Sequence, residues 1–542
     1  MKTISMRKLI AAIGAAALLS TAAVAIAPSA YAAAPTCTKA SDGIETCTGT
    51  LSNGAGYLIK VPAKFGGTFF YWNHGIRFTY PLPGVITVPK GVEELTPSNV
   101  PETAMLRAGY GLATYDGVST GGLRGWNTVD RVEMLKELID TVKAKYTVKK
   151  GVVYGSSQAG SIITPFVEKY PTYADSVGIM AGVTPSIGQS LQALCDAFYI
   201  LSVFADPTIK GCAAMGTKGL AGHYAAAAEF GKVVALLTAW GGNLGAPGLE
   251  YPAALKGSGI PQRSALLLTG LLIGLPAKSA HMDGITTSPV IAEQSINATV
   301  AILENFGEAI ATGTFGGQAV SELTGPGFYD NTKTNWFSLL DPADSGRYNL
   351  GLSGDGAIAA MLGVLSLAPR VTGDAAAIAK LKALDKSKFD TTKPVVLLSN
   401  EADRLVFAGN SALYVDKARA IYDAKLAIYE AARDTAATSA ERAAAAKLKP
   451  VWNVASLYAM TPETYTVYTA QGLPNLAGAP SPSGVGHQNF TLKQMMAWVK
   501  ILAHAADTGK VGTPGYLQQY IKKAPYLNSD LDYRPTDLKY NW

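Results

Sequence analysis

A nine-residue stretch, Val152–Gly160, constrains the fold of this 542-residue chain more than any other feature. It places two serines on a tight turn between a short apolar strand and a helix that extends to about Lys169. A strand that turns directly into a helix is the start of a β-α-β unit, and such units build parallel sheets covered by helices on both faces. Small residues at Gly155 and Ala159 flank Ser157 at a distance of two positions, so the turn can be sharp enough to expose its hydroxyl group.

The alternation of strand and helix extends to both sides of this turn. Strands are predicted at 54–62, 68–72, 109–115, 176–181, 394–399 and 464–469 from their apolar and β-branched composition. Helical spacing of apolar residues predicts helices from about 127 to 142 and from 492 to 505, and an Ala-rich stretch at 413–448 also favours helix. Between 185 and 391 the pattern is helical and loop-like. The sequence therefore predicts an α/β core, 33–184 and 392–542, interrupted by a large helical insertion.

The first residues are typical of an export signal. Lys2, Arg7 and Lys8 precede an apolar run at 9–26, and Ala30-Tyr31-Ala32 has the small-x-small pattern of a cleavage site. We predict a signal peptide at 1–32 and an extracellular protein without an integral membrane span after cleavage. An uncleaved membrane anchor is the alternative, because the run approaches spanning length.

Four cysteines in an exported chain indicate two disulfides. Three connectivities are conceivable, and sequence proximity favours Cys37–Cys47 and Cys195–Cys212. The cysteine and histidine spacing does not fit a metal site. The formal charge of +6 is small for this length and no basic cluster stands out, so nucleic acid is not expected as a partner.

The Val152–Gly160 stretch resembles the nucleophile elbow of the α/β-hydrolase superfamily, G-x-S-x-G, with Ala159 in place of the second glycine. The similarity is greatest to secreted, actinomycete-type serine hydrolases with a large helical lid. It implies an α/β-hydrolase core with a mostly parallel sheet, a mainly helical lid domain at 185–391, and Ser157 as nucleophile. Ser156 is the alternative, but its neighbours two positions away, Tyr154 and Gln158, are large.

A catalytic serine needs a base and an acid, which occur in this superfamily in the order Ser…Asp…His. Of five histidines, His487 lies on a glycine-rich loop between the last predicted strand and the closing helix. Asp403 follows the 394–399 strand and is preferred to Glu401 as the acid. Asp403 could instead pair with Arg404 or cap the next helix. The remaining histidines lie too early, in the insertion or in the last helix, at 74, 223, 281 and 504.

An oxyanion hole requires two backbone N–H donors. The elbow implies the amide of Gln158 as one donor. The Asn73-His74-Gly75-Ile76 segment resembles the His-Gly turn of these enzymes and implies the amide of Gly75 or Ile76 as the other. A tight turn without chemistry is the alternative.

These residues predict a serine hydrolase that cleaves small or oligomeric carboxylic esters of apolar or aromatic character, without a cofactor or metal. No phosphate-binding glycine loop or dinucleotide-binding motif is present in the sequence. A proline-preferring aminopeptidase would use the same residues together with lid carboxylates, for which Glu229, Glu250 and Glu293 are candidates. A binding protein on a hydrolase scaffold is the non-enzymatic alternative. The oligomeric state is not predicted.

Overall fold

The computed structural model describes residues 35–542 apart from 93, 98, 120–121, 243–250, 287–293, 386, 391, 478–480, 536–537 and 540–542. Its centre is one ten-stranded sheet with the strand order β1-β2-β3-β5-β4-β6-β7-β8-β9-β10. The strands are β1 Thr36–Lys39, β2 Glu45–Thr50, β3 Gly56–Val61, β4 Thr68–Asn73, β5 Gly111–Tyr115, β6 Lys150–Ser156, β7 Ser176–Met180, β8 Val395–Asn400, β9 Val454–Ala459 and β10 Leu527–Asn528. The signal peptide predicted at 1–32 lies outside the described residues.

The sheet is mostly parallel, as predicted. Strands β4 to β9 pair in parallel, whereas β1, β2, β3 and β10 pair antiparallel at the two edges. The carboxyl ends of β4, β6, β7, β8 and β9 therefore meet at one edge of the sheet, where ligand sites of such sheets form.

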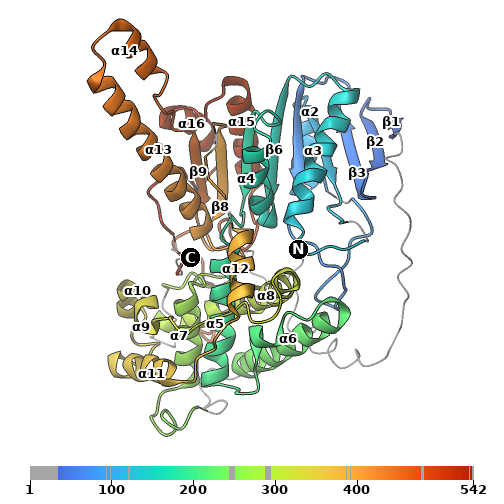
Figure 1. Cartoon of the computed structure of the whole chain (residues 1–542). Coiled ribbons are helices and arrows are strands. Elements are labelled where there is room, and N and C mark those ends of the chain that lie inside the picture. Colours follow the sequence, from blue (N-terminus) through green and yellow to red (C-terminus); the bar gives the residue numbers. More distant parts are fainter. Residues whose placement is uncertain are drawn as a thin grey trace.

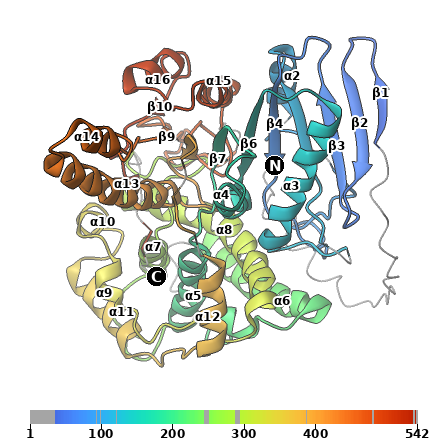
Figure 2. The same ribbon diagram turned by 45° about the horizontal axis from the view of Figure 1, so that its top comes forward.

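Helices cover both faces of the sheet (Figure 2). Val153 of β6 belongs to the hydrophobic cluster on one face, under α3 (Thr128–Lys145), α4 (Gly160–Lys169) and α13 (Gly409–Thr435). Its two neighbours on β6 belong to the cluster on the opposite face, under α2 (Asn99–Arg107), α15 (Leu492–Thr508) and α16 (Pro514–Ile521). This alternation follows from the two-residue period of a strand and explains why the central strands are apolar throughout.

The residues between β7 and β8 form a helical layer that lies beyond the carboxyl ends of the parallel strands (Figure 1). Its helices are α5 Ile187–Phe204, α6 Gly219–Gly242, α7 Gln262–Ile273, α8 Gln294–Thr324, α9 Trp336–Leu339, α10 Pro342–Arg347, α11 Asp355–Leu367 and α12 Ala375–Leu384. We call this layer the lid. Its helices share a hydrophobic cluster that is separate from the two clusters of the sheet and that also includes Trp126, Val183 and Val406 from loops of the core. One lid helix, α5, is long and apolar enough to cross a membrane, but 78% of that stretch is buried inside the protein.

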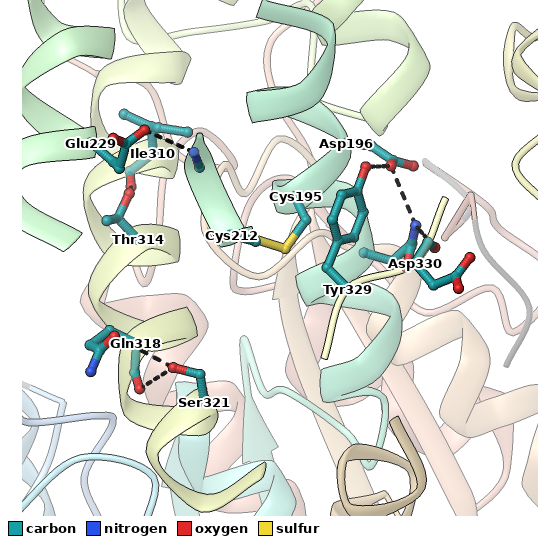
Figure 3. Close-up of a disulfide and its surroundings, with 12 residues drawn as sticks. Cys195, Asp196, Cys212, Glu229, Ile310, Thr314, Gln318, Ser321, Tyr329 and Asp330 are labelled. Atoms are coloured by element: carbon teal, nitrogen blue, oxygen red, sulfur yellow. Dashed lines mark hydrogen bonds between the residues drawn. A yellow bond between two sulfur atoms is a disulfide. The ribbon is translucent and has the colours of Figure 1, made fainter. Parts of the chain in front are cut away.

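A disulfide and buried hydrogen bonds hold the lid together (Figure 3). Cys195 of α5 is bonded to Cys212, and Cys37 of β1 is bonded to Cys47 of β2, so both expected pairs are present. Near the Cys195–Cys212 disulfide (Figure 3), the carboxylate of Glu229 accepts hydrogen bonds from the backbone N–H groups of Lys210 and Gly211, at 2.6 and 2.8 Å. This carboxylate is therefore occupied in organising the lid.

The structure corrects the last predicted strand. The 464–469 segment forms no strand, and the strand next to β8 is β9, Val454–Ala459, whose residues are all buried. Backbone N–H groups of Tyr465 and Thr466 instead donate to Asp283 of the lid, both at 3.0 Å. The Thr, Tyr and Val composition of 464–469 thus reflects an extended segment that binds the lid.

Other differences lie at the edges of the fold. The antiparallel strands β1 and β2 and the short β10 were not predicted, because they are short and partly exposed. The Ala-rich stretch is a hairpin of α13 and α14 (Ser439–Ala446), which projects from the core in Figure 1. A capping box at Thr438 and Glu441 starts α14, so the single helical run is divided there.

Asp385 connects the two ends of the lid. Its carboxylate accepts hydrogen bonds from the N–H groups of Ile187 and Gly188, at 2.6 and 2.8 Å, in the first turn of α5. These bonds favour the charged form, but burial outweighs them and raises the pKa of Asp385 to about 6. The side chain therefore closes a loop of nearly two hundred residues at the point where the chain leaves and re-enters the core.

This shifted pKa predicts a pH dependence of stability. Because the pKa is raised on folding, protonation of Asp385 favours the folded state, so its contribution is fully present below about pH 4 and is lost as the pH rises through about 6. The difference in free energy of unfolding between wild type and Asp385→Asn should therefore decrease between about pH 4 and pH 7, measured by urea unfolding. Asp390→Asn, which removes an exposed ion pair with Lys425, is the matched control. A difference independent of pH would contradict the prediction.

Candidate active site

Ser157 stands at the carboxyl end of β6 in a strained backbone conformation. Its φ is +58°, in the left-handed region that serine rarely adopts, whereas Ser156 before it is extended at φ −132°. Such a conformation costs about 1–2 kcal/mol and persists only where the surrounding structure enforces it. The backbone turns here from β6 into a short 3₁₀ turn, Ser157–Ala159, and then into α4.

The neighbours of this turn have no room for larger side chains. A Cβ atom at Gly155 would overlap the carbonyl oxygen of Asn73 and lie 2.6 Å from the Cβ of Ala159. A Cβ atom at Gly160 would lie 2.5 Å from the carbonyl oxygen of Val183. These close approaches explain why small residues stand at positions 155, 159 and 160.

Asp403 and His487 meet beyond the ends of β8 and β9. The Nδ1 atom of His487 lies 2.8 Å from Oδ2 of Asp403, which is completely buried. The other carboxylate oxygen of Asp403 accepts from the N–H groups of Leu405 and Val406, at 2.8 and 3.0 Å. With a carboxylate as partner, Nδ1 carries the proton and Nε2 has the free lone pair that a general base requires.

Backbone hydrogen bonds tie the histidine loop to the acid loop. Ala402 N–H donates to the carbonyl of Gly484 at 2.8 Å, and Gly486 N–H donates back to the carbonyl of Ala402 at 2.9 Å. The side-chain amide of Asn400 donates to the carbonyl of Gly486 at 2.5 Å. Gly484 and Gly486 have φ of +89° and +85°, which explains the glycine-rich sequence of this loop.

Ser157 makes no side-chain hydrogen bond to His487 within the part of the chain that the structure describes. The Nε2 atom of His487 instead accepts a hydrogen bond from the side-chain amide of Gln488, at 3.0 Å. Gln488 itself has a left-handed backbone with φ +59°. The ring nitrogen that would take a proton from Ser157 is thus occupied by the adjacent residue, and this amide must move before His487 can act as a base.

The Asn73–Ile76 segment runs beside the serine. A Cβ atom at Gly75 would lie 3.0 Å from Cβ and 3.4 Å from Oγ of Ser157, so glycine allows the backbone at position 75 to lie this close to the serine side chain. His74 is buried, and its Nδ1 lies 2.7 Å from the carbonyl oxygen of Gly75. Burial, with the charges of Arg131 and Arg77, holds the pKa of His74 well below its usual range, so the ring is neutral and donates this hydrogen bond.

Glu401, the alternative acid, has a different role. Its carboxylate accepts hydrogen bonds from Lys278 of the lid and from Thr461, each at 2.8 Å. Burial raises its pKa, but Lys278 and the Thr461 hydrogen bonds outweigh this effect and lower the pKa of Glu401 overall. Arg404, the alternative partner of Asp403, pairs instead with Glu308 at 2.7 Å.

The other histidines have structural partners. His223 of α6 lies 3.2 Å from the carbonyl of Pro81 through Nε2, and His281 lies 2.5 Å from Glu304 through Nδ1. His504 stacks on the ring of Tyr516. Within the described residues, one group of candidate metal ligands lies close enough to share an ion: Cys37, Glu45 and Cys47. Its two cysteines are bonded to each other and offer no thiolate.

An apolar cavity of about 110 Å³ opens beside Ser157 between the sheet and the lid. Ile76 and Gln158 line it from the core, and α5, α7 and α8 line it from the lid. Its lining residues are Ile76, Trp126, Ser157, Gln158, Val183, Ile187, Ser190, Leu191, Leu194, Ala197, Ile273, Phe306, Ala309, Ile310, Thr312, Gly313, Gly316, Gly317, Arg404, Leu405, Val406 and Phe407. No carboxylate is among these described lining residues, and Arg404 is their one charged side chain.

Most residues that line the cavity, Gly316 among them, were not predicted from the sequence. Two residues that contact predicted site residues, Arg131 and Gln488, were also not predicted. One of them left a signal, because Arg131 occupies a core-facing position among the apolar residues of the 127–142 helix. The others become visible only when the loops and the lid are placed in space.

Known proteins offer distant comparisons only. No protein-family model matches the chain, and no curated protein matches it. Among solved structures, feruloyl esterase B from Aspergillus oryzae is 12% identical over 88% of this chain and 87% of its own, with a TM-score of 0.37. Candida antarctica lipase A is 11% identical over 72% and 74%, with a TM-score of 0.30. Tannin acyl hydrolase from Aspergillus niger is 11% identical over 81% and 78%, with a TM-score of 0.28. Similarity at this level does not identify a substrate.

The order of the strands and the position of the helical layer identify the fold. A mostly parallel sheet carries a serine turn after β6, an acid after β8 and a histidine after β9, with the lid inserted between β7 and β8. The chain has an α/β-hydrolase fold. In this fold these positions all lie at the carboxyl edge of the sheet, where Ser157, Asp403 and His487 stand.

The amide of Gln488 generates a prediction about reactivity. Gln488→Gly removes the hydrogen bond to His487 and keeps the left-handed backbone without strain. We expect labelling by a fluorophosphonate probe to become about fivefold faster, which corresponds to a hydrogen bond of about 1 kcal/mol. The rate of labelling, followed by mass spectrometry, measures the effect. Tyr526→Gly, at an exposed residue with φ +62°, controls for the added glycine. A rate equal to or below that of wild type would contradict the prediction.

Proposed function

We propose that this chain is a secreted serine hydrolase that cleaves carboxylic esters of apolar or aromatic character through an acyl-enzyme. The observation that carries the proposal is the strained Ser157, which borders an apolar, lid-covered cavity and shares its sheet edge with the Asp403–His487 pair. The predicted signal peptide and the two disulfides support export.

The reaction begins when His487 accepts the proton of Ser157 through Nε2. The serine oxygen attacks the ester carbonyl, and the carbonyl oxygen becomes an oxyanion bound by the amides of Gln158 and of Gly75 or Ile76. Asp403 keeps the imidazole in its Nδ1–H tautomer and stabilises the imidazolium. The ring then returns the proton to the leaving alcohol, and water releases the acid by the reverse sequence.

The cavity supports an apolar ester as substrate. Its wall is formed by Leu, Ile, Val and Phe side chains, and a dry wall of this kind strengthens every hydrogen bond to the oxyanion. An aminopeptidase would need a carboxylate for the substrate amine. Glu229 is held by backbone N–H groups of the lid, whereas Glu250 and Glu293 lie outside the described residues.

Ester turnover is the first test of the proposal. Wild-type protein should hydrolyse 4-nitrophenyl esters in a series from acetate to palmitate, and Ser157→Ala should lose about a million-fold in kcat because the nucleophile is absent. Aminoacyl nitroanilides measured in parallel separate a peptidase from an esterase. Activity that survives in Ser157→Ala would contradict the assignment of the nucleophile. A folded wild type that neither turns over esters nor reacts with a fluorophosphonate would favour the binding protein.

Gly316 provides a test of the cavity. It lines the cavity from α8, and a Cβ atom built on it meets no other atom within 4 Å, so a larger side chain would grow into open space. Gly316→Leu should reduce kcat/KM for long-chain and aromatic acyl esters by about tenfold or more and leave the acetate ester nearly unchanged. Replacing a helical glycine should also stabilise the fold by up to about 1 kcal/mol, so lower activity would not reflect unfolding.

The matched control is Gly363→Leu. Gly363 is also a helical glycine with open space around its Cβ position, but it lies in α11 and does not line the cavity. This variant should keep the wild-type preference along the ester series. Equal loss for acetate and long-chain esters in Gly316→Leu would show that the cavity does not receive the acyl group.

A further inference from the structure

Arg131 is a buried cation without a carboxylate partner. It lies on α3, is 1% exposed, and forms no ion pair within the described part of the chain. The nearby Asp116 is engaged by Arg77 and Arg124, at 3.0 and 2.9 Å. Removing a guanidinium from water without a counter-charge costs several kcal/mol, so fixed dipoles around Arg131 must compensate for the lost hydration.

Two of these dipoles belong to the segments that flank Ser157. The Nη1 atom of Arg131 donates to the side-chain oxygen of Gln158 at 2.8 Å, and Nη2 donates to the carbonyl of His74 at 2.8 Å. The side-chain Nε2 of Gln158 in turn donates to the carbonyl of Gly125 at 2.8 Å. One rigid, planar group thus spans the gap between the serine turn and the Asn73–Ile76 segment.

The hydrogen bond to His74 acts directly on a proposed oxyanion donor. The carbonyl of His74 and the N–H of Gly75 belong to the same peptide group, so a cation bound to the oxygen withdraws charge from the N–H and makes it a stronger donor. The ring of His74 donates to the carbonyl of Gly75, which polarises the next N–H, that of Ile76, in the same way. Each candidate N–H donor is therefore polarised by a hydrogen bond to the carbonyl oxygen of its own peptide group.

We propose that Arg131 is the positioning residue of the oxyanion hole. Its guanidinium fixes the distance between the two donor segments and polarises the peptide that carries one donor, without touching the substrate. This inference rests on the proposed function, because it assigns Arg131 a role in stabilising the oxyanion of that reaction.

A purely structural role would have a different signature. Loss of a packing residue lowers the free energy of unfolding and affects substrate binding and turnover together. Loss of oxyanion stabilisation lowers kcat with little change in KM, because the interaction strengthens only as charge develops on the substrate oxygen. It also weakens the binding of a trifluoromethyl ketone inhibitor, which forms a tetrahedral oxyanion on the serine.

The test compares three variants with wild type on one 4-nitrophenyl ester. Arg131→Lys keeps the charge but cannot bridge both segments, and Gln158→Met removes one arm while the backbone N–H of residue 158 remains. Lys136→Met is the control, because it removes a cation from the same helix, α3, whose ion-pair partner Asp140 also lies on that helix. The measurements are kcat, KM, the inhibition constant of the ketone and the midpoint of urea unfolding.

We expect kcat to fall about 10- to 100-fold in Arg131→Lys and about tenfold in Gln158→Met, somewhat less than the loss of a whole donor. The affinity for the ketone should fall by the same factors, KM should stay within about twofold, and Lys136→Met should keep the wild-type kcat. If Arg131→Lys does not fold, the comparison of Gln158→Met with Lys136→Met decides the question.

Two results would overturn the inference. One is wild-type kcat in a folded Arg131→Lys or, where that variant does not fold, in Gln158→Met. The other is a loss of activity that follows the unfolding midpoint in every variant while the affinity for the ketone is unchanged. Failure of the proposed function is distinguishable, because in that case wild type itself shows no ester turnover and no fluorophosphonate labelling.

Discussion

The left-handed backbone of Ser157 is the constraint on which the rest of the site depends. Serine does not hold this conformation unaided, and here it is enforced from two sides. Gly155 packs against Asn73 at the end of β4, and Gly160 packs against the backbone of Val183 in the loop that follows β7. Both contacts exist because β4, β6 and β7 are adjacent and parallel. The sheet therefore sets the direction of the hydroxyl group, and a change in strand order would remove it.

The lid shields the carboxyl edge of the sheet from water. Residues at the carboxyl ends of parallel strands face solvent, where the charge of an oxyanion would be screened by water. The lid places α5, α7 and α8 over this edge and encloses an apolar cavity, and it is held there by the ion pairs of Lys278 with Glu401 and of Glu308 with Arg404. The hydrophobic cluster of the lid also includes residues from loops of the core, so apolar packing attaches the lid to the sheet edge as well.

Local patterns predicted the central sheet, and tertiary contacts decided the rest. The strands β3 to β8 and the helices α3 and α15 have either a regular spacing of apolar residues or a short, mainly apolar run, and both features can be recognised in the sequence. The 464–469 segment was assigned to a strand on composition, which cannot distinguish pairing with β8 from binding to the lid. Asp403 and His487, 84 residues apart, were predicted as partners and lie 2.8 Å apart. Gln488 was not predicted, because its contact with the imidazole of His487 depends on a left-handed backbone conformation that the sequence does not indicate.

Arg131 illustrates how an exception to a pattern carries information. Charged residues are rarely buried without a partner, so a charge on the apolar face of a helix must be compensated by groups that the fold places around it. In this chain the compensating groups are a backbone carbonyl next to Gly75 and the side chain of Gln158, both attached to candidate oxyanion donors. An apolar residue at position 131 would pack against the sheet without the desolvation cost, but it could neither orient these dipoles nor polarise the peptide. The buried cation is therefore explained better by the charge that develops beside Ser157 than by the stability of the helix.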